Sequence, residues 1–266
     1  MSAYAKAGVV FLAMVMMVPA ARGQEQSAAE LAKAAQNPVA NMMSFPFQNN
    51  TSFGIGPYDR AQNVLNIQPV IPLMDGRLIT RTIIPVVWQP DIASESGTDV
   101  GLGDINFTAF YSPETQGLTL GFGPVLSIPT GGELRGTQKW ALGPSLVVLA
   151  TPGQWVTGVL INNIWSIAGK AERPDVNRML LQPFLNYNVG TTGWYISVAP
   201  IITADWKAES SNRWIVPLGG TVGKLSRIGS RGLPVNIQAG AFYNVVKPDL
   251  GPKWSTRLQV QILLPA

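Results

Sequence analysis

The stretch WYISVAPIITADW, residues 194–206, alternates between two kinds of side chain along its whole length. One set of alternate positions is apolar and has a tryptophan at each end, Trp194 and Trp206, whereas the set from Tyr195 to Asp205 is more polar. A period of two predicts an extended strand with one face in apolar surroundings. At about 3.3 Å per residue and a tilt of about 40°, the stretch rises about 30 Å, the thickness of a membrane's hydrocarbon core.

Turn residues divide the rest of the chain into further stretches of this kind. Short turns such as MDG and GTTG alternate with longer loops such as NTSFGIGPY and TGGELRGTQK along the first nine strands. An even strand number, with short turns at one rim and longer loops at the other, is typical of bacterial outer-membrane barrels. The sequence therefore predicts an all-β fold, a transmembrane antiparallel up-and-down β-barrel of about 12 strands with both termini in the periplasm. The other eleven expected strands are 42–49, 59–73, 77–88, 99–112, 118–129, 140–149, 154–168, 177–189, 213–226, 234–246 and 253–264.

The start of the chain has the pattern of a signal peptide. Lys6 supplies the basic residue, an apolar run follows at 8–18, and small residues stand at Ala21 and Gly23. The apolar run is shorter than the ~18 residues that span a bilayer, so cleavage after Gly23 is favoured over an uncleaved anchor. The expected organisation is a signal peptide at 1–23, a periplasmic N-terminal segment at 24–41 and an outer-membrane β-barrel at 42–266.

The segment 24–41 carries the one convincing helical pattern of the mature chain. Ser27 can cap the helix, Glu30 is its capping-box partner, and Pro38 ends it. Twelve strands lie between the eight of barrels that side chains can fill and the sixteen to eighteen of open porins. We therefore expect a narrow or plugged lumen, with this short helix as a candidate plug.

Composition excludes several classes of function. The chain has no histidine and no cysteine, which excludes Ser-His and Cys-His nucleophile pairs and histidine metal sites. We therefore expect no enzyme activity, no catalytic residue, no metal and no cofactor. Loss of Lys6 and Arg22 with the signal peptide lowers the formal net charge of +4 by two, and a charge this small provides no case for nucleic-acid binding.

The energetic cost of charge in lipid indicates which residues face the lumen. An Arg or Lys that faces lipid at mid-depth costs about 2 to 4 kcal/mol, so Arg81 and Asp104 are expected to point inward. They lie on neighbouring strands and are expected to pair, either as a constriction that selects solutes or as a pair that only neutralises a buried charge. The expected membrane girdle is Trp194, Trp206, Trp214 and Trp254. The expected lumen-lining residues are Arg81, Asp104, Asn106, Arg178, Gln182, Phe184, Asn186, Tyr195, Asp205, Asn236, Gln238, Phe242, Asn244, Arg257, Gln259 and Gln261.

Prolines recur within the expected strands, where a residue without an N–H weakens the hydrogen-bond ladder. A closed barrel in hydrocarbon has no free edge to absorb that loss. We therefore predict local bulges or weakened pairings at these positions. They are Pro69, Pro124, Pro144, Pro183 and Pro200 on the apolar phase, and Pro85 and Pro217 on the other phase.

Several segments resemble a known family. LAKAAQNPVANMMSFPFQNNTSFGIGPYDRAQNVLNIQPVIP, NNIWSIAG, RPDVNRMLLQPFLNYN, PIITADW and FYNVVKPD are similar to a family of outer-membrane transporters grouped with the barrels of phenol meta-cleavage pathways, some of them mislabelled neuromedin U. The resemblance covers residues 29–265 and implies a membrane barrel that passes hydrophobic or aromatic compounds. It assigns no binding residue. The chain departs from outer-membrane barrels at its last residue, Ala266, where the assembly signal usually ends in an aromatic residue.

These observations predict an outer-membrane channel or transporter for passive passage of a small hydrophobic or aromatic solute. The expected partners are outer-membrane lipid and lipopolysaccharide, the barrel-assembly machinery and the solute. Acidic loop residues such as Asp91 and Glu133 either bridge lipopolysaccharide through divalent cations or are simply solvated. A non-conducting structural or adhesion barrel and a soluble secreted β-sandwich remain as alternatives.

Overall fold

The computed structural model describes residues 27–264. The expected signal peptide at 1–23, its cleavage after Gly23 and the terminal Ala266 lie outside the described residues. Within this range, none of the helices combines the length and apolar character needed to cross a membrane.

The described residues form one α-helix, α1 (Ala28–Ala35), two short 3₁₀ turns at Met74–Gly76 and Ser210–Asn212, and fifteen strand segments. The strand segments are β1 (Met43–Ile55), β2 (Arg60–Ile67), β3 (Val70–Leu73), β4 (Leu78–Pro90), β5 (Thr98–Leu102), β6 (Ile105–Tyr111), β7 (Thr119–Ile128), β8 (Lys139–Ala150), β9 (Trp155–Gly169), β10 (Asn177–Asn188), β11 (Trp194–Val198), β12 (Ile202–Asp205), β13 (Trp214–Ile228), β14 (Leu233–Val246) and β15 (Trp254–Leu264).

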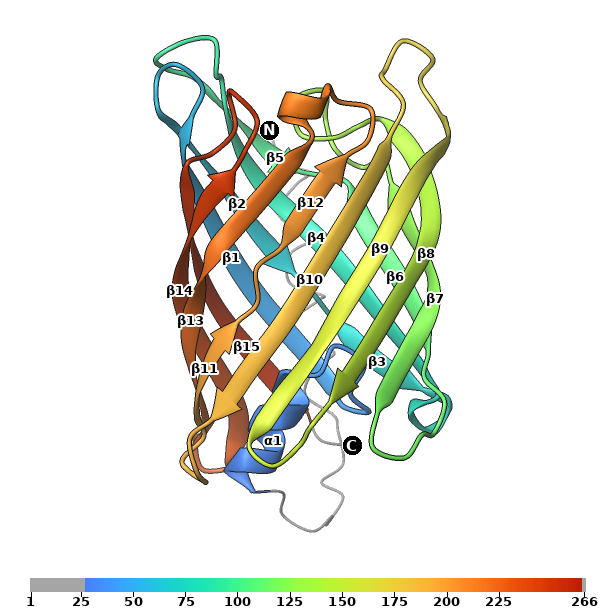
Figure 1. Cartoon of the computed structure of the whole chain (residues 1–266), viewed down its shortest axis with the longest axis vertical. Helices are drawn as coiled ribbons and strands as arrows, with labels where there is room; N and C mark the ends of the chain where they lie inside the picture. Colours follow the sequence, from blue (N-terminus) through green and yellow to red (C-terminus); the bar gives the residue numbers. More distant parts are fainter. Residues whose placement is uncertain (1–26, 265–266) are drawn as a thin grey trace, which may run out of the picture.

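The sheet closes into a barrel. Each strand pairs antiparallel with its neighbours along the chain, and β1 pairs with β15 to complete the ring. Three barrel strands are interrupted: β2 continues as β3 after 68–69, β5 as β6 after 103–104, and β11 as β12 after 199–201. With each interrupted strand counted once, the barrel has twelve strands (Figure 1), so the predicted fold class is confirmed and the soluble sandwich is wrong.

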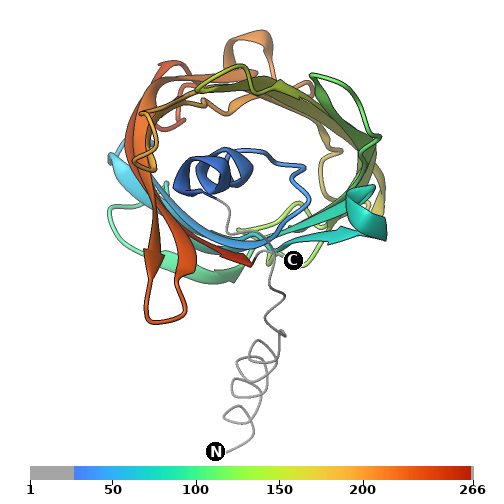
Figure 2. The ribbon, with the colours of Figure 1, turned by 90° about the horizontal axis from the view of Figure 1, so that it is seen from below.

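The connections lie at two rims. The helix rim, at the bottom of Figure 1, carries α1 and the connections 74–77, 112–118, 151–154, 189–193 and 229–232. The loop rim, at the top, carries the connections 56–59, 91–97, 129–138, 170–176, 206–213 and 247–253. Figure 2, seen from below, shows α1 inside the barrel.

The predicted boundary of the first strand is wrong. We expected this strand to end at Asn49 and a long loop to follow, but β1 runs to Ile55 and turns into β2 through 56–59. The polar residues at the end of β1 pair with β15 as far as Phe53 opposite Trp254, and this pairing keeps them extended. The strict alternation of short and long connections therefore fails at the first connection.

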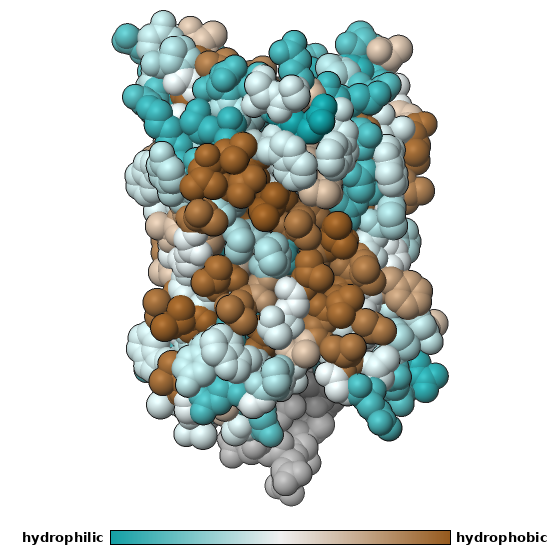
Figure 3. Space-filling view, viewed as in Figure 1, coloured by the Kyte–Doolittle hydropathy of each residue, from teal (hydrophilic) through white to brown (hydrophobic). Residues whose placement is uncertain are grey.

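The outer surface is apolar around the middle of the barrel. In β11, Trp194, Ile196 and Val198 are exposed on the outside, whereas Tyr195 and Ser197 are buried on the inside. Figure 3 shows hydrophobic residues gathered between two more polar ends. This arrangement, apolar outside and more polar inside, is the pattern of a barrel embedded in lipid.

Aromatic side chains stack near the ends of the strands on this outer surface. Trp254 stacks on Phe53 with 4.2 Å between ring centroids, and Trp206 meets Trp214 edge-on at 5.5 Å. Trp194 lies at the opposite rim, where the Lys224 ammonium is 4.9 Å from its ring centroid. The four expected girdle tryptophans therefore lie at the two ends of the barrel wall, as membrane interfaces require.

Pro200 interrupts the ladders on both sides of its strand. Its N–H is missing, and the neighbouring β10 pairs with β12 only up to Leu181 and with β11 only from Leu185. Residues 182–184 therefore have no partner on that side. On the other side of the same strand, residues 216–220 of β13 have no partner in β11 or β12.

The other predicted prolines lie at similar irregularities. Pro183 pairs regularly with Val159 of β9 and lies on its other side in the unpaired stretch 182–184. Pairs are missing from the β6–β7 ladder around Pro124 and from the β8–β9 ladder around Pro144. Pro69 lies in the break between β2 and β3, Pro85 faces the break between β5 and β6, and Pro217 lies at a register shift. The predicted bulges and weakened pairings are therefore confirmed.

A charge placed on the outer surface tests whether this surface meets lipid. Val222, midway along β13, and Val245, near the loop rim on β14, are each 50% exposed. We expect Val222→Lys to lower the free energy of unfolding by about 2–4 kcal/mol and Val245→Lys by about 0–1 kcal/mol, because the penalty falls toward the interfaces. Urea unfolding in phospholipid vesicles, followed by tryptophan fluorescence, measures both. Equal costs at the two positions would contradict a membrane-embedded surface.

Candidate functional site

The helix α1 begins with the predicted capping box. The Glu30 N–H donates to Ser27 Oγ at 3.2 Å, and the Ser27 N–H donates to the Glu30 carboxylate at 2.8 Å. Two hydrogen bonds hold the pKa of Glu30 below its ordinary value. The larger effect comes from the Ser27 backbone N–H, and the next comes from the Ser27 side chain. Because the folded state lowers this pKa, the stability that the ionised Glu30 carboxylate gives to the folded protein is present at neutral pH. It is lost as the pH falls through the lowered pKa.

The apolar side of α1 packs on the inner wall of the barrel. Leu31 and Ala32 are fully buried, and they form a cluster with Met42, Leu225 of β13 and Leu263 of β15. Burial of a side chain such as Leu31 contributes about 1.5–3 kcal/mol. Helix and wall therefore hold together without any covalent link.

Polar contacts add to this packing. Lys33 Nζ donates to the carbonyl of Gly153 at 2.5 Å, and Gln36 Nε2 donates to Asn188 Oδ1 at 2.8 Å. These contacts join the helix to the β8–β9 turn and to the end of β10. We name residues 27–42 the plug, because they occupy the lumen at the helix rim.

The plug continues past the helix to an apolar part of the wall. Val39 is buried there, and Gly121 on β7 provides its space, since a Cβ at Gly121 would lie 2.8 Å from Val39 Cγ1. Sequence reasoning proposed the helix as a plug but missed this second anchor. The buried residues that cluster with Val39 are Val70, Ile79, Phe110, Val147, Leu149, Val156, Leu160 and Phe184.

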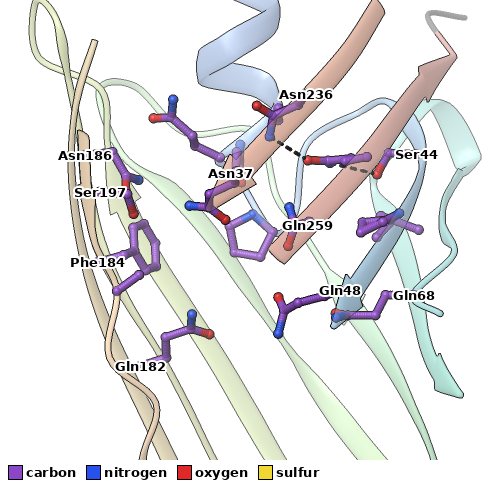
Figure 4. A pocket seen from close by; sticks show the side chains of 18 of the residues that line it. Asn37, Ser44, Gln48, Gln68, Gln182, Phe184, Asn186, Ser197, Asn236 and Gln259 are labelled. Carbon is purple, nitrogen blue, oxygen red and sulfur yellow. Dashed lines mark hydrogen bonds between the residues drawn. The ribbon is translucent and has the colours of Figure 1, made fainter. Parts of the chain in front are cut away.

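Two adjoining cavities occupy the lumen. The upper cavity, toward the loop rim, has a volume of about 1180 Å³, and the lower cavity, beside the plug, has a volume of about 150 Å³. The two cavities meet where the same residues line both. Figure 4 shows the lower cavity with Gln48, Gln68 and Gln182 around it. The shared residues are Gln48, Gln68, Arg81, Leu160 and Gln182.

All the expected lumen-lining residues except Phe242 and Asn244 border a cavity. Phe242 is buried beneath the Arg257 guanidinium, whose carbon is 4.7 Å from the ring centroid, and Asn244 Nδ2 donates to the carbonyl of Pro252 at 2.8 Å. The lower cavity is bordered by Arg81, Gln182, Phe184, Asn186, Tyr195, Asn236, Gln238, Arg257, Gln259 and Gln261, and the upper cavity by Arg81, Asp104, Asn106, Arg178, Gln182 and Asp205.

The predicted pair of Arg81 with Asp104 is wrong. The register of β4 on β6 places Arg81 opposite Thr108, so Asp104 lies nearer the loop rim, in the break between β5 and β6. Arg81 Nη2 instead donates to Gln68 Oε1 at 2.5 Å. Neither the selecting pair nor the neutralising pair therefore exists.

Asp104 binds the loop 129–138 instead. Its carboxylate accepts the Gly131 N–H at 3.0 Å and both the N–H and the hydroxyl of Thr137 at 2.7 Å. The loop closes on itself above this carboxylate, because Cβ atoms at Gly131 and Gly136 would come within 3 Å of each other's backbone and of Asp104. Asp104 thus folds the loop into the mouth of the upper cavity, where Leu134 and its neighbours line the wall.

Arginines that sequence reasoning missed join this loop to its neighbours. Arg173 donates to the carbonyls of Glu133 at 3.1 Å and of Gly136 at 2.9 Å. Arg135 forms an ion pair with Asp99 at the start of β5. The glycines of TGGELRGTQK are the sequence signal for a tightly folded loop, but they do not identify its partners.

Amide groups form a chain across four strands beside the lower cavity. The Tyr195 hydroxyl donates to Asn236 Oδ1 at 2.9 Å, Asn236 Nδ2 donates to Gln261 Oε1 at 3.2 Å, and Gln261 Nε2 donates to Ser44 Oγ at 3.3 Å. Part of this chain is visible in Figure 4. Gly223 allows the tyrosine to lie flat, since a Cβ there would overlap its ring. Residues 27–264 contain no group of three or more acidic, histidine or cysteine side chains placed to hold a metal ion.

Comparison with known proteins finds likeness in fold. No protein-family model matches the chain, and no curated protein matches it. An outer-membrane channel from Pseudomonas putida F1 is 19% identical, with a TM-score of 0.58 over 84% of this chain and 94% of that one. The NanC porin is 6% identical, with a TM-score of 0.54 over 84% of this chain and all of its own. At these identities the likeness concerns the barrel fold.

Removal of the Asp104 carboxylate tests how the loop 129–138 is held. We expect Asp104→Ala to leave three donors without their acceptor and to speed tryptic cleavage after Arg135 by at least about tenfold, because each such loss costs about 1–3 kcal/mol. Asp75→Asn, in an exposed turn at the helix rim, is the control and should leave this cleavage unchanged. Limited proteolysis with mass spectrometry measures the rate. Equal cleavage of the wild type and Asp104→Ala would mean that other contacts hold the loop.

Proposed function

We propose that this protein is a channel of the bacterial outer membrane through which a small solute passes without chemical change. The observation that carries the proposal is the pair of adjoining cavities, which together extend from the mouth of a closed barrel to its plug. Polar and apolar side chains share their walls, so a solute can exchange one set of weak contacts for another along its path.

The solute is small and hydrophobic or aromatic. The resemblance to the barrels of phenol meta-cleavage pathways supports this class. The lower cavity supports it too, because Val70, Leu160, Phe184 and Tyr195 border it next to the amides. Aromatic walls favour planar apolar solutes through stacking and dispersion contacts.

The proposed location follows from the outer surface. The apolar surface contacts outer-membrane lipid, the loop rim faces lipopolysaccharide, and the barrel-assembly machinery inserts the chain after export with its signal peptide. The whole sequence has no histidine, which favours transport over hydrolytic chemistry.

The plug favours one alternative, a non-conducting barrel with a structural or adhesive role. Leu31 and Ala32 are fully buried against the wall, and Gln36 bonds to Asn188. Such contacts close part of the lumen at the helix rim. Conduction therefore requires either a path beside the plug or its movement.

Conductance distinguishes the two proposals. We expect purified full-length protein in planar bilayers to give discrete current steps, and proteoliposomes to swell in small aromatic solutes. Folded protein is identified first by its heat-modifiable migration on a gel. Folded protein that gives neither current nor swelling would support the structural role and contradict the channel.

A cross-link tests whether the plug must move. The chain has no cysteine, so Gln36→Cys combined with Asn188→Cys can be joined by a short bis-maleimide. We expect the link to abolish the current steps, because it fixes the plug where it occupies the lumen. Each single-cysteine variant treated with the same reagent is the control and should conduct normally. Unchanged current through the linked protein would mean that solutes pass beside a fixed plug.

A further inference from the structure

The charged residues that line the lower cavity are all of one sign. Arg81 of β4 and Arg257 of β15 border it, and no aspartate or glutamate does. The remaining lining residues are amides, serines, one tyrosine and apolar side chains. The cavity therefore presents two positive charges to whatever enters it.

Neutral groups hold both arginines. Arg81 donates to the amide oxygen of Gln68 at 2.5 Å. Arg257 Nε donates to Asn50 Oδ1 at 3.2 Å, and its Nη1 donates to the carbonyl of Ala199 at 3.3 Å. A guanidinium has five N–H donors, so each arginine keeps donors beyond these contacts.

Two arginines of the upper cavity differ in this respect. Arg178 pairs with Asp205 at 3.1 Å, and Arg135 pairs with Asp99. No ion pair among the described residues includes Arg81 or Arg257. The upper cavity is thus lined by cations and carboxylates together, whereas the lower cavity is lined by cations alone.

Unbalanced charge of this kind favours an anion. Arg81 and Arg257 are partly removed from water in a narrow lumen, where like charges repel and low-dielectric walls strengthen the field. Guanidinium groups match the two oxygens of a carboxylate, and basic residues select anions in other pores. An anion in the cavity that both side chains border would offset their unbalanced charge and their lost hydration.

The cavity also has room for an apolar body. Phe184, Tyr195 and Leu160 border it together with the two arginines. Its volume of about 150 Å³ is of the size that holds one benzene ring in a protein interior. A ring with one carboxylate matches both the charge and the space.

We infer that the lower cavity is a binding site for a small organic carboxylate with an apolar or aromatic body, with Arg81 and Arg257 as the groups that recognise its charge. This inference rests on the proposed channel and narrows its solute class. It requires that the site prefer a carboxylate over a neutral molecule of the same shape.

Calorimetric titration of the folded, detergent-solubilised full chain tests that preference. Benzoate and its neutral counterpart benzamide are the probes. We expect benzoate to bind at least about tenfold more tightly, since hydrogen bonds to a charged group are roughly twice as strong as neutral ones. Arg81→Gln combined with Arg257→Gln should remove the preference, and Arg81→Lys combined with Arg257→Lys should retain part of it because the charge remains.

A control of equal charge lies outside the lumen. Arg77 is in the exposed turn that follows β3, and Lys224 stacks on Trp194 on the outer surface. Arg77→Gln combined with Lys224→Gln should leave the preference for benzoate unchanged. Equal binding of the two probes by the wild type, or an unchanged preference in the Arg81→Gln and Arg257→Gln variant, would overturn the inference.

Bilayer currents separate this inference from the channel proposal. In a potassium chloride gradient, the reversal potential should show chloride preferred over potassium, and this preference should fall when Arg81 and Arg257 both become glutamine. Current without selectivity or benzoate preference would overturn the inference and leave the channel standing. Preferential benzoate binding without any current would uphold the site and contradict the channel.

Discussion

The pairing of β1 with β15 is the interaction on which the rest of this structure depends, because it removes the free edges of the sheet. Hydrocarbon offers no partner to an unpaired N–H or C=O, so strands that cross a bilayer are stable only in a closed ladder. The pairs run from Met43 opposite Leu264 to Phe53 opposite Trp254. Closure decides which face of every strand meets lipid and which side chains share the lumen.

The closed ladder also explains why the strand prolines matter. Each lacks one donor, and the break at Pro200 leaves backbone groups without a partner in the neighbouring strands. Arg257 reaches one of them, the carbonyl of Ala199, from inside the barrel at 3.3 Å. The same side chain borders the lower cavity, so one arginine supports the wall and contributes charge to the proposed binding site.

Twelve strands enclose more space than their inward side chains fill, and the chain itself occupies part of that space. The plug fills the helix rim, and the loop 129–138 folds into the other end over Asp104. Glycine makes both close fits feasible, since Gly121 leaves room for Val39 and Gly223 for Tyr195. The lumen is therefore shaped by non-local packing as much as by the wall.

The sequence by itself determined the barrel, its strand number, the inward phase of its strands and the capping box at Ser27. These features are local, because they follow from a period of two, from the cost of charge in lipid and from contacts three residues apart. Only the tertiary structure decided that β1 extends to Ile55 and that Asp104 binds the loop 129–138 rather than Arg81. Those outcomes depend on the register between strands and on loops that fold inward. The alternation of side chains indicates which face a residue occupies, but it does not contain the stagger that sets which residues meet.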